Sequence, residues 1–152
     1  MDDFPTVGIV GGGQLARMAQ QSAIALGVNL RVLAAAAGDS AALVINDVRV
    51  GDHDDAAAVL AFADGVDAVT FDHEHVPSAI LQELQERNIA VRPGPDALLH
   101  AQDKIVMRQA LTDAGLPCPR WAALDADAEA ETFRRKIEEL GEGVGWPIVL
   151  KT

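Results

Sequence analysis

The chain has 152 residues, of which 49% are hydrophobic and 23% charged, a size and composition typical of one globular domain or of one domain with part of a second. Lysine and arginine number 12 against 23 aspartate and glutamate residues, and the resulting net charge of −11 opposes non-specific binding to nucleic acid or to an acidic membrane. No apolar run approaches the roughly 20 residues of a membrane-spanning helix, and the acidic positions 2 and 3 are unlike a secretory signal, so we expect a cytoplasmic protein.

Strands and helices are predicted to alternate over the first part of the chain. Apolar and β-branched runs predict strands at residues 4–10, 29–34, 47–50, 66–71 and 89–91. Helical spacing of apolar residues predicts helices at residues 14–26, 54–63 and 78–87. This order predicts an α/β fold, with an open, mostly parallel sheet and helices on both faces, in a Rossmann-like substrate-binding domain at residues 1–95. Ligands of such sheets bind at the carboxyl ends of the strands.

Two of these helices have a predicted inward face. The helix at residues 14–26 is expected to pack through Leu15, Met18, Ala19 and Ser22. The helix at residues 78–87 is expected to pack through Ile80, Leu81 and Leu84. Gly27 is expected to end the first of these helices, because glycine readily adopts the left-handed conformation of a helix end.

The pattern changes after Pro95. A helix is predicted at residues 97–114, a short edge strand at 121–123, an amphipathic helix at 127–140 and a last strand at 147–152. We interpret residues 96–152 as the beginning of a second domain. A terminal strand without a following partner leaves an exposed edge, so we also interpret the end of the chain as a truncation.

A glycine turn follows the first predicted strand. Residues 11–16 read Gly-Gly-Gly-Gln-Leu-Ala, which fits G-x-G-x-x-A, where bare backbone and a helix N-terminus attract a phosphate. A dinucleotide site would also need an acidic residue at the end of the second strand, and residues 33–37 supply none. The glycines could instead serve only the close packing of strand and helix. Gln14 favours a polar small-molecule site, because its amide can bond a ligand and adds little to a core.

An acidic and histidine-rich segment, Asp72-His73-Glu74-His75, follows the strand at 66–71. Alternate side chains of an extended segment point to opposite sides, so these four residues are not expected to converge on one metal ion. Their place at a strand end makes Asp72 and Glu74 candidates to accept hydrogen bonds from ligand hydroxyls or amines. The alternative is that the acidic residues, Glu74 above all, complement the dipole of the helix at 78–87.

Five motifs occur in order along the chain. They are Gly-Gly-Gly-Gln-Leu-Ala-Arg-Met at 11–18, Val-Thr-Phe-Asp-His-Glu-His-Val-Pro at 69–77, Gln-Asp-Lys at 102–104, Gly-Leu-Pro at 115–117 and Pro-Ile-Val-Leu-Lys at 147–151. With them the chain resembles the ATP-grasp carboxylases called N5-carboxyaminoimidazole ribonucleotide synthases. The likeness covers the family's amino-terminal α/β domain and the first part of its ATP-grasp region.

The resemblance implies an ATP-grasp ligase that forms a carbon–nitrogen bond in purine biosynthesis. Its substrates would be ATP, bicarbonate and 5-aminoimidazole ribonucleotide, its products the N5-carboxylated nucleotide, ADP and phosphate, and its metal Mg²⁺. The family's lid, magnesium ligands and catalytic residues would follow Thr152, so we expect no metal ligand in this segment and no activity from it alone. A homodimer is also expected from the resemblance.

The resemblance also implies where the substrate binds. Gln14, Leu15 and Asp72 fall where this family contacts the ribonucleotide, and we include Gly13 and Glu74 in the predicted substrate site. Related enzymes more often have glutamate in place of Asp72, so this shorter carboxylate would need a closer substrate or a bridging water.

Two lysines are implied to bind ATP. Lys104 falls where the family has a basic residue for the nucleotide phosphates, often arginine, and Lys151 falls on its ATP-binding lysine. An ammonium group compensates phosphate charge well. Lys104 could otherwise be a solvated helix residue, whereas Lys151 lies in an apolar strand, where a buried ammonium would need a partner.

Three other functions remain open on the sequence. Another ATP-grasp ribonucleotide ligase or transferase would share this architecture. A dehydrogenase would use the glycine turn for NAD, against which the missing strand-end acid argues. A non-catalytic binding or dimerisation module is the third alternative.

Overall fold

A computed structural model describes residues 4–151. The chain forms two compact units, the first ending at Gln102 and the second beginning at Asp103. The boundary predicted at residue 95 falls on the first residue of helix α4 (Pro95–Gln102), which packs on α3 (Ser78–Glu86) within the first unit. Within residues 4–151, no helix is both long enough and apolar enough to cross a membrane.

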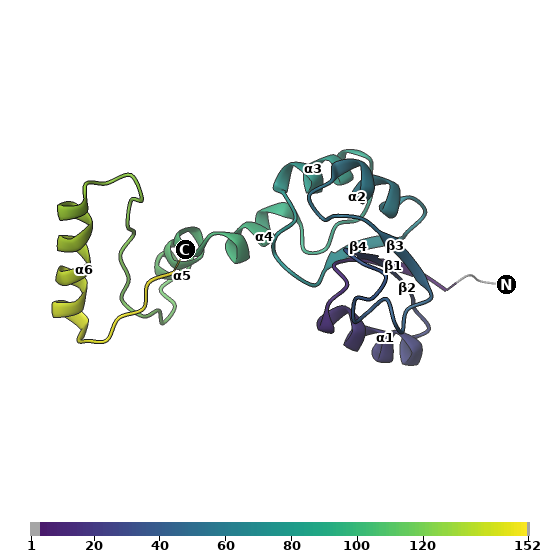
Figure 1. The fold of residues 1–152 in the computed structure, drawn as a ribbon, viewed down its shortest axis with the longest axis horizontal. Coiled ribbons are helices and arrows are strands. Elements are labelled where there is room, and N and C mark those ends of the chain that lie inside the picture. Colours follow the sequence, from purple (N-terminus) through teal and green to yellow (C-terminus); the bar gives the residue numbers. More distant parts are fainter. Residues whose placement is uncertain (1–3, 152) are drawn as a thin grey trace. The chain divides into compact units, whose positions relative to one another are not determined.

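The first unit is built on a four-stranded parallel sheet (Figure 1). Its strands are β1 (Thr6–Val10), β2 (Asn29–Ala34), β3 (Asp47–Val50) and β4 (Ala68–Phe71), in the order β3-β2-β1-β4. In this register Val10 lies opposite both Leu33 and Phe71, so the carboxyl ends of β2, β1 and β4 meet at one edge of the sheet. The strand predicted at 89–91 is reduced to a single parallel bridge between Val69 and Val91.

Helices cover both faces of this sheet, as predicted (Figure 1). Helix α1 (Gln14–Leu26) lies on one face, and α2 (Ala56–Ala63) and α3 lie on the other. Each face has its own buried core. The α1 face is filled by Ile9, Ala16, Val32, Ala41 and Ile45. The α2 and α3 face is larger and contains the inward side chains predicted for α3, which are Ile80, Leu81 and Leu84.

The predicted inward face of α1 is confirmed for Ala19, which packs against the core, and is wrong for the other three residues. Leu15 and Met18 are 65% and 60% exposed, and Ser22 is exposed as well, whereas the fully buried residues of this helix are Ala16 and Ala23. The glycine turn brings α1 so close to the sheet that only small side chains fit between them. The bounds of the helix are as predicted, and Gly27 ends it in the left-handed conformation with φ of 65°.

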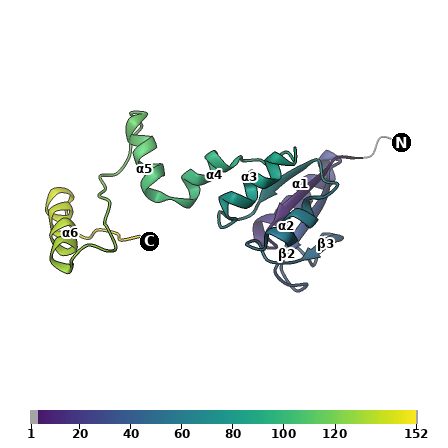
Figure 2. The ribbon, with the colours of Figure 1, turned by 90° about the horizontal axis from the view of Figure 1, so that it is seen from above.

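The second unit contains two helices, α5 (Lys104–Asp113) and α6 (Ala130–Val144). The single helix predicted at 97–114 is divided by Asp103, whose carboxylate accepts the main-chain N–H groups of Ile105 and Val106 and so caps α5. Neither of the strands predicted at 121–123 and 147–152 forms within the described part of the chain, where α6 is followed by irregular chain (Figure 2).

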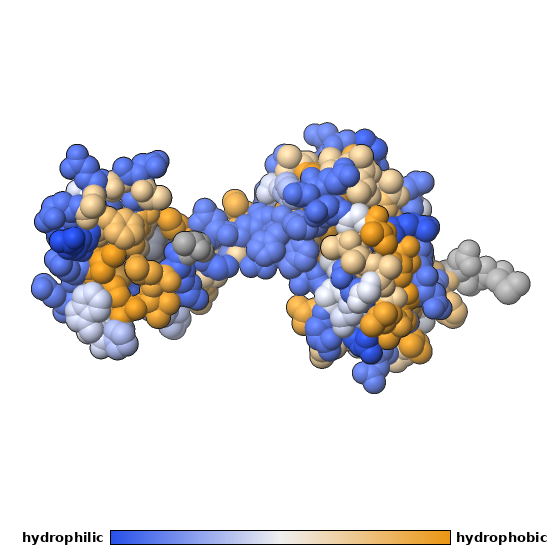
Figure 3. All heavy atoms as spheres, in the orientation of Figure 1, coloured by the Kyte–Doolittle hydropathy of each residue, from blue (hydrophilic) through white to orange (hydrophobic). Residues whose placement is uncertain are grey.

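The described residues of the second unit bury no hydrophobic side chain. Gly141 is its one buried residue between positions 103 and 151, and apolar surface shows on this unit in Figure 3. Its exposed large hydrophobic residues are Ile105, Leu116, Val144, Trp146, Val149 and Leu150. A segment this short without a core has little hydrophobic stabilisation of its own.

Candidate functional site

The glycine turn joins β1 to α1 and lies tightly against Asp72. Gly11 has φ of 110°, which strongly favours glycine, and a Cβ there would collide with the Asp72 carboxylate. A Cβ on Gly13 would lie 2.6 Å from Asp72 Oδ2, so the carboxylate needs a bare backbone there too. The glycines therefore allow close packing at the turn, and the N–H groups of Gly11 and Gly13 are used within the protein, by Leu33 O and Asp72 Oδ2.

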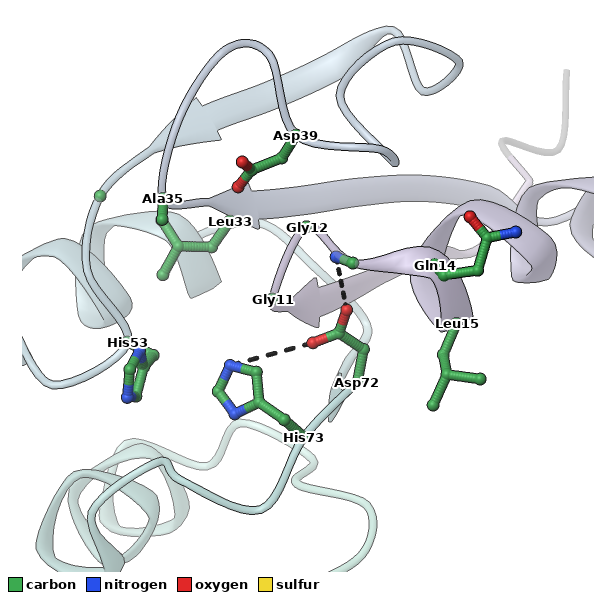
Figure 4. A pocket seen from close by; sticks show the side chains of 12 residues that line it. Gly11, Gly12, Gln14, Leu15, Leu33, Ala35, Asp39, His53, Asp72 and His73 are labelled. Atoms are coloured by element: carbon green, nitrogen blue, oxygen red, sulfur yellow. Dashed lines mark hydrogen bonds and ion pairs between the residues drawn. The ribbon is translucent and has the colours of Figure 1, made fainter.

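Asp72 follows β4 directly and is held at the turn by a short hydrogen bond. Its main-chain N–H donates to Val10 O at 3.1 Å, and the Gly13 N–H donates to its Oδ2 at 2.6 Å (Figure 4). The side chain is only 6% exposed. Its second oxygen, Oδ1, is buried and accepts no hydrogen bond in the described structure. A buried carboxylate oxygen without a donor is unfavourable, so a ligand that brings a donor would be favoured here, although the side chains around Oδ1 would have to move to admit it.

A cavity of about 400 Å³ lies at the carboxyl ends of the strands. It is lined by Gly11, Gly12, Gly13, Gln14, Leu15, Leu33, Ala35, Asp39, Gly51, His53, Asp72 and His73. Four of the five residues predicted for the substrate line this one cavity, so a single ligand can reach the turn and Asp72 together. Glu74 is not among the lining residues, and Lys104 and Lys151 belong to the second unit.

The start of α1 offers backbone donors more than side chains. Gln14 Oε1 accepts a hydrogen bond from Ser40 Oγ at 3.0 Å, and the side chains of Gln14 and Leu15 point away from Asp72 (Figure 4). The first N–H groups of a helix have no acceptor within the helix, and the N-cap residue Gly13 supplies none from a side chain. Near Asp72, a ligand would therefore meet main-chain N–H groups rather than the Gln14 amide.

Three histidines lie close together, and two of them, His53 and His73, line the cavity. The ring of His73 lies 4.7 Å from that of His53 and 5.4 Å from that of His75, measured between centroids. His73 Nδ1 accepts the main-chain N–H of His75 at 3.2 Å, and its Nε2 lies 3.9 Å from Asp72 Oδ1. Burial lowers the pKa of His73, and the neighbouring histidines, His53 and His75, lower it further. The carboxylates of Asp72 and Glu74 act in the opposite direction but do not reverse the shift. Within residues 4–151, no three histidine, cysteine or acidic side chains are placed to hold a metal ion.

Sequence reasoning missed three polar residues that line the cavity. His53 follows β3 and Asp39 lies in the chain between β2 and β3, where its Oδ2 accepts the Ala36 N–H at 3.1 Å. For His73 the sequence indicates no role beyond the metal site that its spacing argues against. The position of His53 just beyond a strand end was a usable signal, but only the strand order brings that end to the glycine turn. A dinucleotide site needs an acidic residue near the end of the second strand, which residues 33–37 lack. Asp39, a little further along the chain, does bring an acidic side chain to this cavity.

Gln102 is a further residue whose role the sequence did not reveal. Its Nε2 donates to Glu74 O and to Val76 O, both at 2.8 Å, and its Oε1 accepts from Ser78 Oγ at 3.3 Å. These bonds fix the chain immediately after Asp72 and His73. Gln102 therefore positions the strand-end segment from the last turn of α4.

Acidic and imidazole side chains line the cavity. Its ionisable lining residues are Asp39, Asp72, His53 and His73, and neither lysine nor arginine is among the described residues that line it. The cavity thus suits groups that donate hydrogen bonds. An anionic group would depend on the N–H groups at the start of α1.

The sequence and the fold match a known family. The family model for the ribonucleotide synthetase preATP-grasp domain matches residues 4–102, which contain every residue lining the cavity. The chain is 49% identical over 147 residues to the N5-carboxyaminoimidazole ribonucleotide synthase of Mycobacterium tuberculosis H37Rv, which covers 97% of this chain and 33% of that protein. It is 52% identical over 136 residues to the same enzyme of Mycobacterium leprae, covering 88% of this chain and 31% of the relative.

Solved structures give the same relationship. The N5-carboxyaminoimidazole ribonucleotide synthetase of Thermus thermophilus superposes with a TM-score of 0.76 at 32% identity, over 93% of this chain and 37% of that one. The Aspergillus clavatus enzyme, solved with ADP and 5-aminoimidazole ribonucleotide, gives a TM-score of 0.80 at 28% identity, over 97% and 38% of the two chains. This chain spans about a third of the length of its relatives. It belongs to the ribonucleotide synthetase preATP-grasp domain family.

Proposed function

We propose that this chain forms the amino-terminal part of an enzyme that carboxylates 5-aminoimidazole ribonucleotide. The reaction would consume ATP and bicarbonate and give N5-carboxyaminoimidazole ribonucleotide, ADP and phosphate, in cytoplasmic purine biosynthesis. The family match and the relatives at 49% and 52% identity support this proposal. On this account, the chain contributes the ribonucleotide site, and residues beyond it would supply most of the ATP-grasp machinery.

One observation supports the ribonucleotide site above all others. Asp72 Oδ1 is buried, lacks a donor and lies in the cavity that the glycine turn also lines. A sugar hydroxyl or an amine of the ribonucleotide would supply the missing hydrogen. The main-chain N–H groups of Gln14 and Leu15 would bind a polar group elsewhere on the same ligand. The bond from Gly13 holds the shorter aspartate against the turn, so the substrate would have to lie close to the turn or bind Asp72 through a bridging water.

Within this proposal Asp72 orients the ligand and also holds the turn. Its bond to Gly13 fixes the carboxylate before the ligand arrives, so little freedom is lost on binding. Glu74 remains a predicted second contact, although it lies outside the cavity lining and its main-chain oxygen is bonded by Gln102.

ATP would provide the energy that activates bicarbonate. We propose Lys104 and Lys151 as its phosphate contacts, on the basis of their positions in the sequence motifs, and both side chains are exposed. Residues 4–151 present no cluster of acidic ligands for Mg²⁺, so no metal-dependent step is assigned to this part of the chain.

The experiment that tests the function is a phosphate-release assay on the full-length protein. Release of phosphate from ATP is expected only when both 5-aminoimidazole ribonucleotide and bicarbonate are present. ATP hydrolysis that ignores the ribonucleotide would contradict the proposal. Hydrolysis that depends instead on another ribonucleotide, such as glycinamide ribonucleotide, would favour a sister ATP-grasp ligase or transferase. Sedimentation of the same protein would test the expected homodimer.

A further inference from the structure

Asp72 and His73 bring a carboxylate oxygen and a ring nitrogen close together beside the cavity. Asp72 Oδ1 and His73 Nε2 are 3.9 Å apart, which is too long for a hydrogen bond between them. Both residues line the cavity (Figure 4). A ligand oxygen would lie at ordinary hydrogen-bond distance, roughly 2.7–3.0 Å, from both atoms once the two side chains move slightly apart, because Asp72 Oδ1 has no exposed surface in the present arrangement.

The protonation of His73 is set by its neighbours. The His75 main-chain N–H donates to His73 Nδ1 at 3.2 Å, so Nδ1 is an acceptor and carries no hydrogen. The one hydrogen of the neutral ring is then on Nε2, the atom that faces Asp72. Four titratable groups act on this ring, and burial together with His53 and His75 outweighs Asp72 and Glu74, lowering its pKa and keeping it neutral near pH 7.

We infer that Asp72 Oδ1 and His73 Nε2 form a pair that recognises a hydroxyl group. The hydroxyl donates its hydrogen to Asp72 and accepts the hydrogen of His73. This inference rests on the proposed function, and it assigns a ribose hydroxyl of the ribonucleotide to this position. His73 thereby becomes a specificity-determining residue, a role that neither the sequence motif nor the metal interpretation gave it.

The other groups of a ribonucleotide fit this pair less well. An aminoimidazole amine can donate to Asp72, but its nitrogen is a poor acceptor and would leave the His73 N–H without a partner. A phosphate oxygen would accept from His73 but lie against the Asp72 carboxylate, where like charges repel. Only a hydroxyl both donates and accepts through one atom.

The test combines changes in the ligand with changes in His73. Calorimetry on the full-length protein would measure binding of 5-aminoimidazole ribonucleotide and of its 2′-deoxy and 3′-deoxy forms. The wild type is expected to bind one deoxy form about tenfold more weakly, the effect of one lost hydrogen-bonded hydroxyl. His73→Phe is expected to bind the ribonucleotide about tenfold more weakly and to discriminate little against that same deoxy form, because the two changes remove one interaction.

Two further variants separate recognition from folding. His100→Asn changes an exposed histidine of α4 that does not line the cavity and is the control, with affinity within about twofold of the wild type. His73→Gln can donate from its amide and is expected to recover part of the lost affinity. If His73→Phe does not fold, nitrogen NMR of the wild type decides instead, with a hydrogen on Nε2 expected and a hydrogen on Nδ1 overturning the inference.

The outcomes distinguish this inference from the function on which it rests. Equal binding of the ribonucleotide and both deoxy forms, or an undiminished affinity of folded His73→Phe, would overturn the hydroxyl pair while phosphate release still supported the function. Failure of the wild type to bind the ribonucleotide, together with no ribonucleotide-dependent phosphate release, would overturn both.

Discussion

The two units of this chain differ in how their helices are stabilised. In the first unit, α1, α2 and α3 bury apolar side chains against a sheet that has a core on each face. In the second, α5 and α6 are equally regular, yet residues 103–151 bury no hydrophobic side chain. Both units therefore contain regular helices. Only the first unit has the tertiary packing that supplies most of the stability of helices in proteins. The candidate ribonucleotide site lies wholly on the well-packed unit.

The largest expected effect is on folding of the separated units. Residues 4–102 are expected to unfold cooperatively on their own, whereas residues 103–152 should lack a cooperative transition, because they have no core to lose. Circular dichroism of the two fragments during heating would measure this. A sharp transition in the second fragment alone would break the comparison.

Matched truncations of leucine side chains sharpen the same comparison. Leu84→Ala removes a fully buried side chain of the first unit and is expected to cost roughly 2–5 kcal/mol of unfolding free energy. Leu150→Ala removes a side chain that is 58% exposed and should change stability by about 0.5 kcal/mol or less. Urea denaturation of both variants is the measurement, and equal losses would contradict the burial difference.

Asp72→Asn separates binding from stability within the first unit. The amide oxygen can still accept the Gly13 N–H, so unfolding free energy should change by about 1 kcal/mol or less. The amide nitrogen would then replace Oδ1, the proposed acceptor of the ligand's hydrogen bond. Because an amide nitrogen cannot accept that bond, ribonucleotide affinity should fall at least about tenfold. Calorimetry tests the affinity, with Lys151→Ala as the control that is expected to weaken ATP alone. Unchanged ribonucleotide affinity in Asp72→Asn would remove Asp72 from the site.

The smallest expected effect is a pH dependence confined to the first unit. Because the pKa of His73 is lowered in the folded protein, the unfolded chain binds the proton more tightly. The contribution of His73 to stability is therefore complete above its unfolded pKa of about 6.5 and is lost as the pH falls through the lower folded value. Denaturation between about pH 7 and pH 5 should show a shallower loss in His73→Phe than in the wild type. Parallel curves would contradict the assignment.

Much of the fold was accessible from the sequence where local signals agree. The bounds of α1, β2 and β3 were predicted to the residue, because a glycine turn, a terminating glycine and short alternating runs mark them. The buried face of α1 was not predicted, because Leu15 and Met18 also match helical spacing. Only the structure shows that the helix lies so close to the sheet that alanines pack between them. The predicted strands at 121–123 and 147–152 failed because a strand requires a partner that periodicity does not reveal.

The candidate site likewise has a part that the sequence predicts and a part that only the structure shows. Parallel topology brings the ends of β1 and β4 together, so the meeting of the glycine turn with Asp72 was predictable. His53 and Asp39 come from segments whose proximity depends on the order β3-β2-β1-β4, and the Gln102 hydrogen bonds depend on how α4 packs. Those features needed the structure.

The proposed function depends most on where the ribonucleotide sits. A crystal structure of the full-length protein with 5-aminoimidazole ribonucleotide tests this most directly. We predict a ribose hydroxyl within hydrogen-bond distance of Asp72 Oδ1, with the ligand lying along the start of α1. Ribonucleotide bound away from the glycine turn, with Asp72 Oδ1 still lacking a donor, would contradict it.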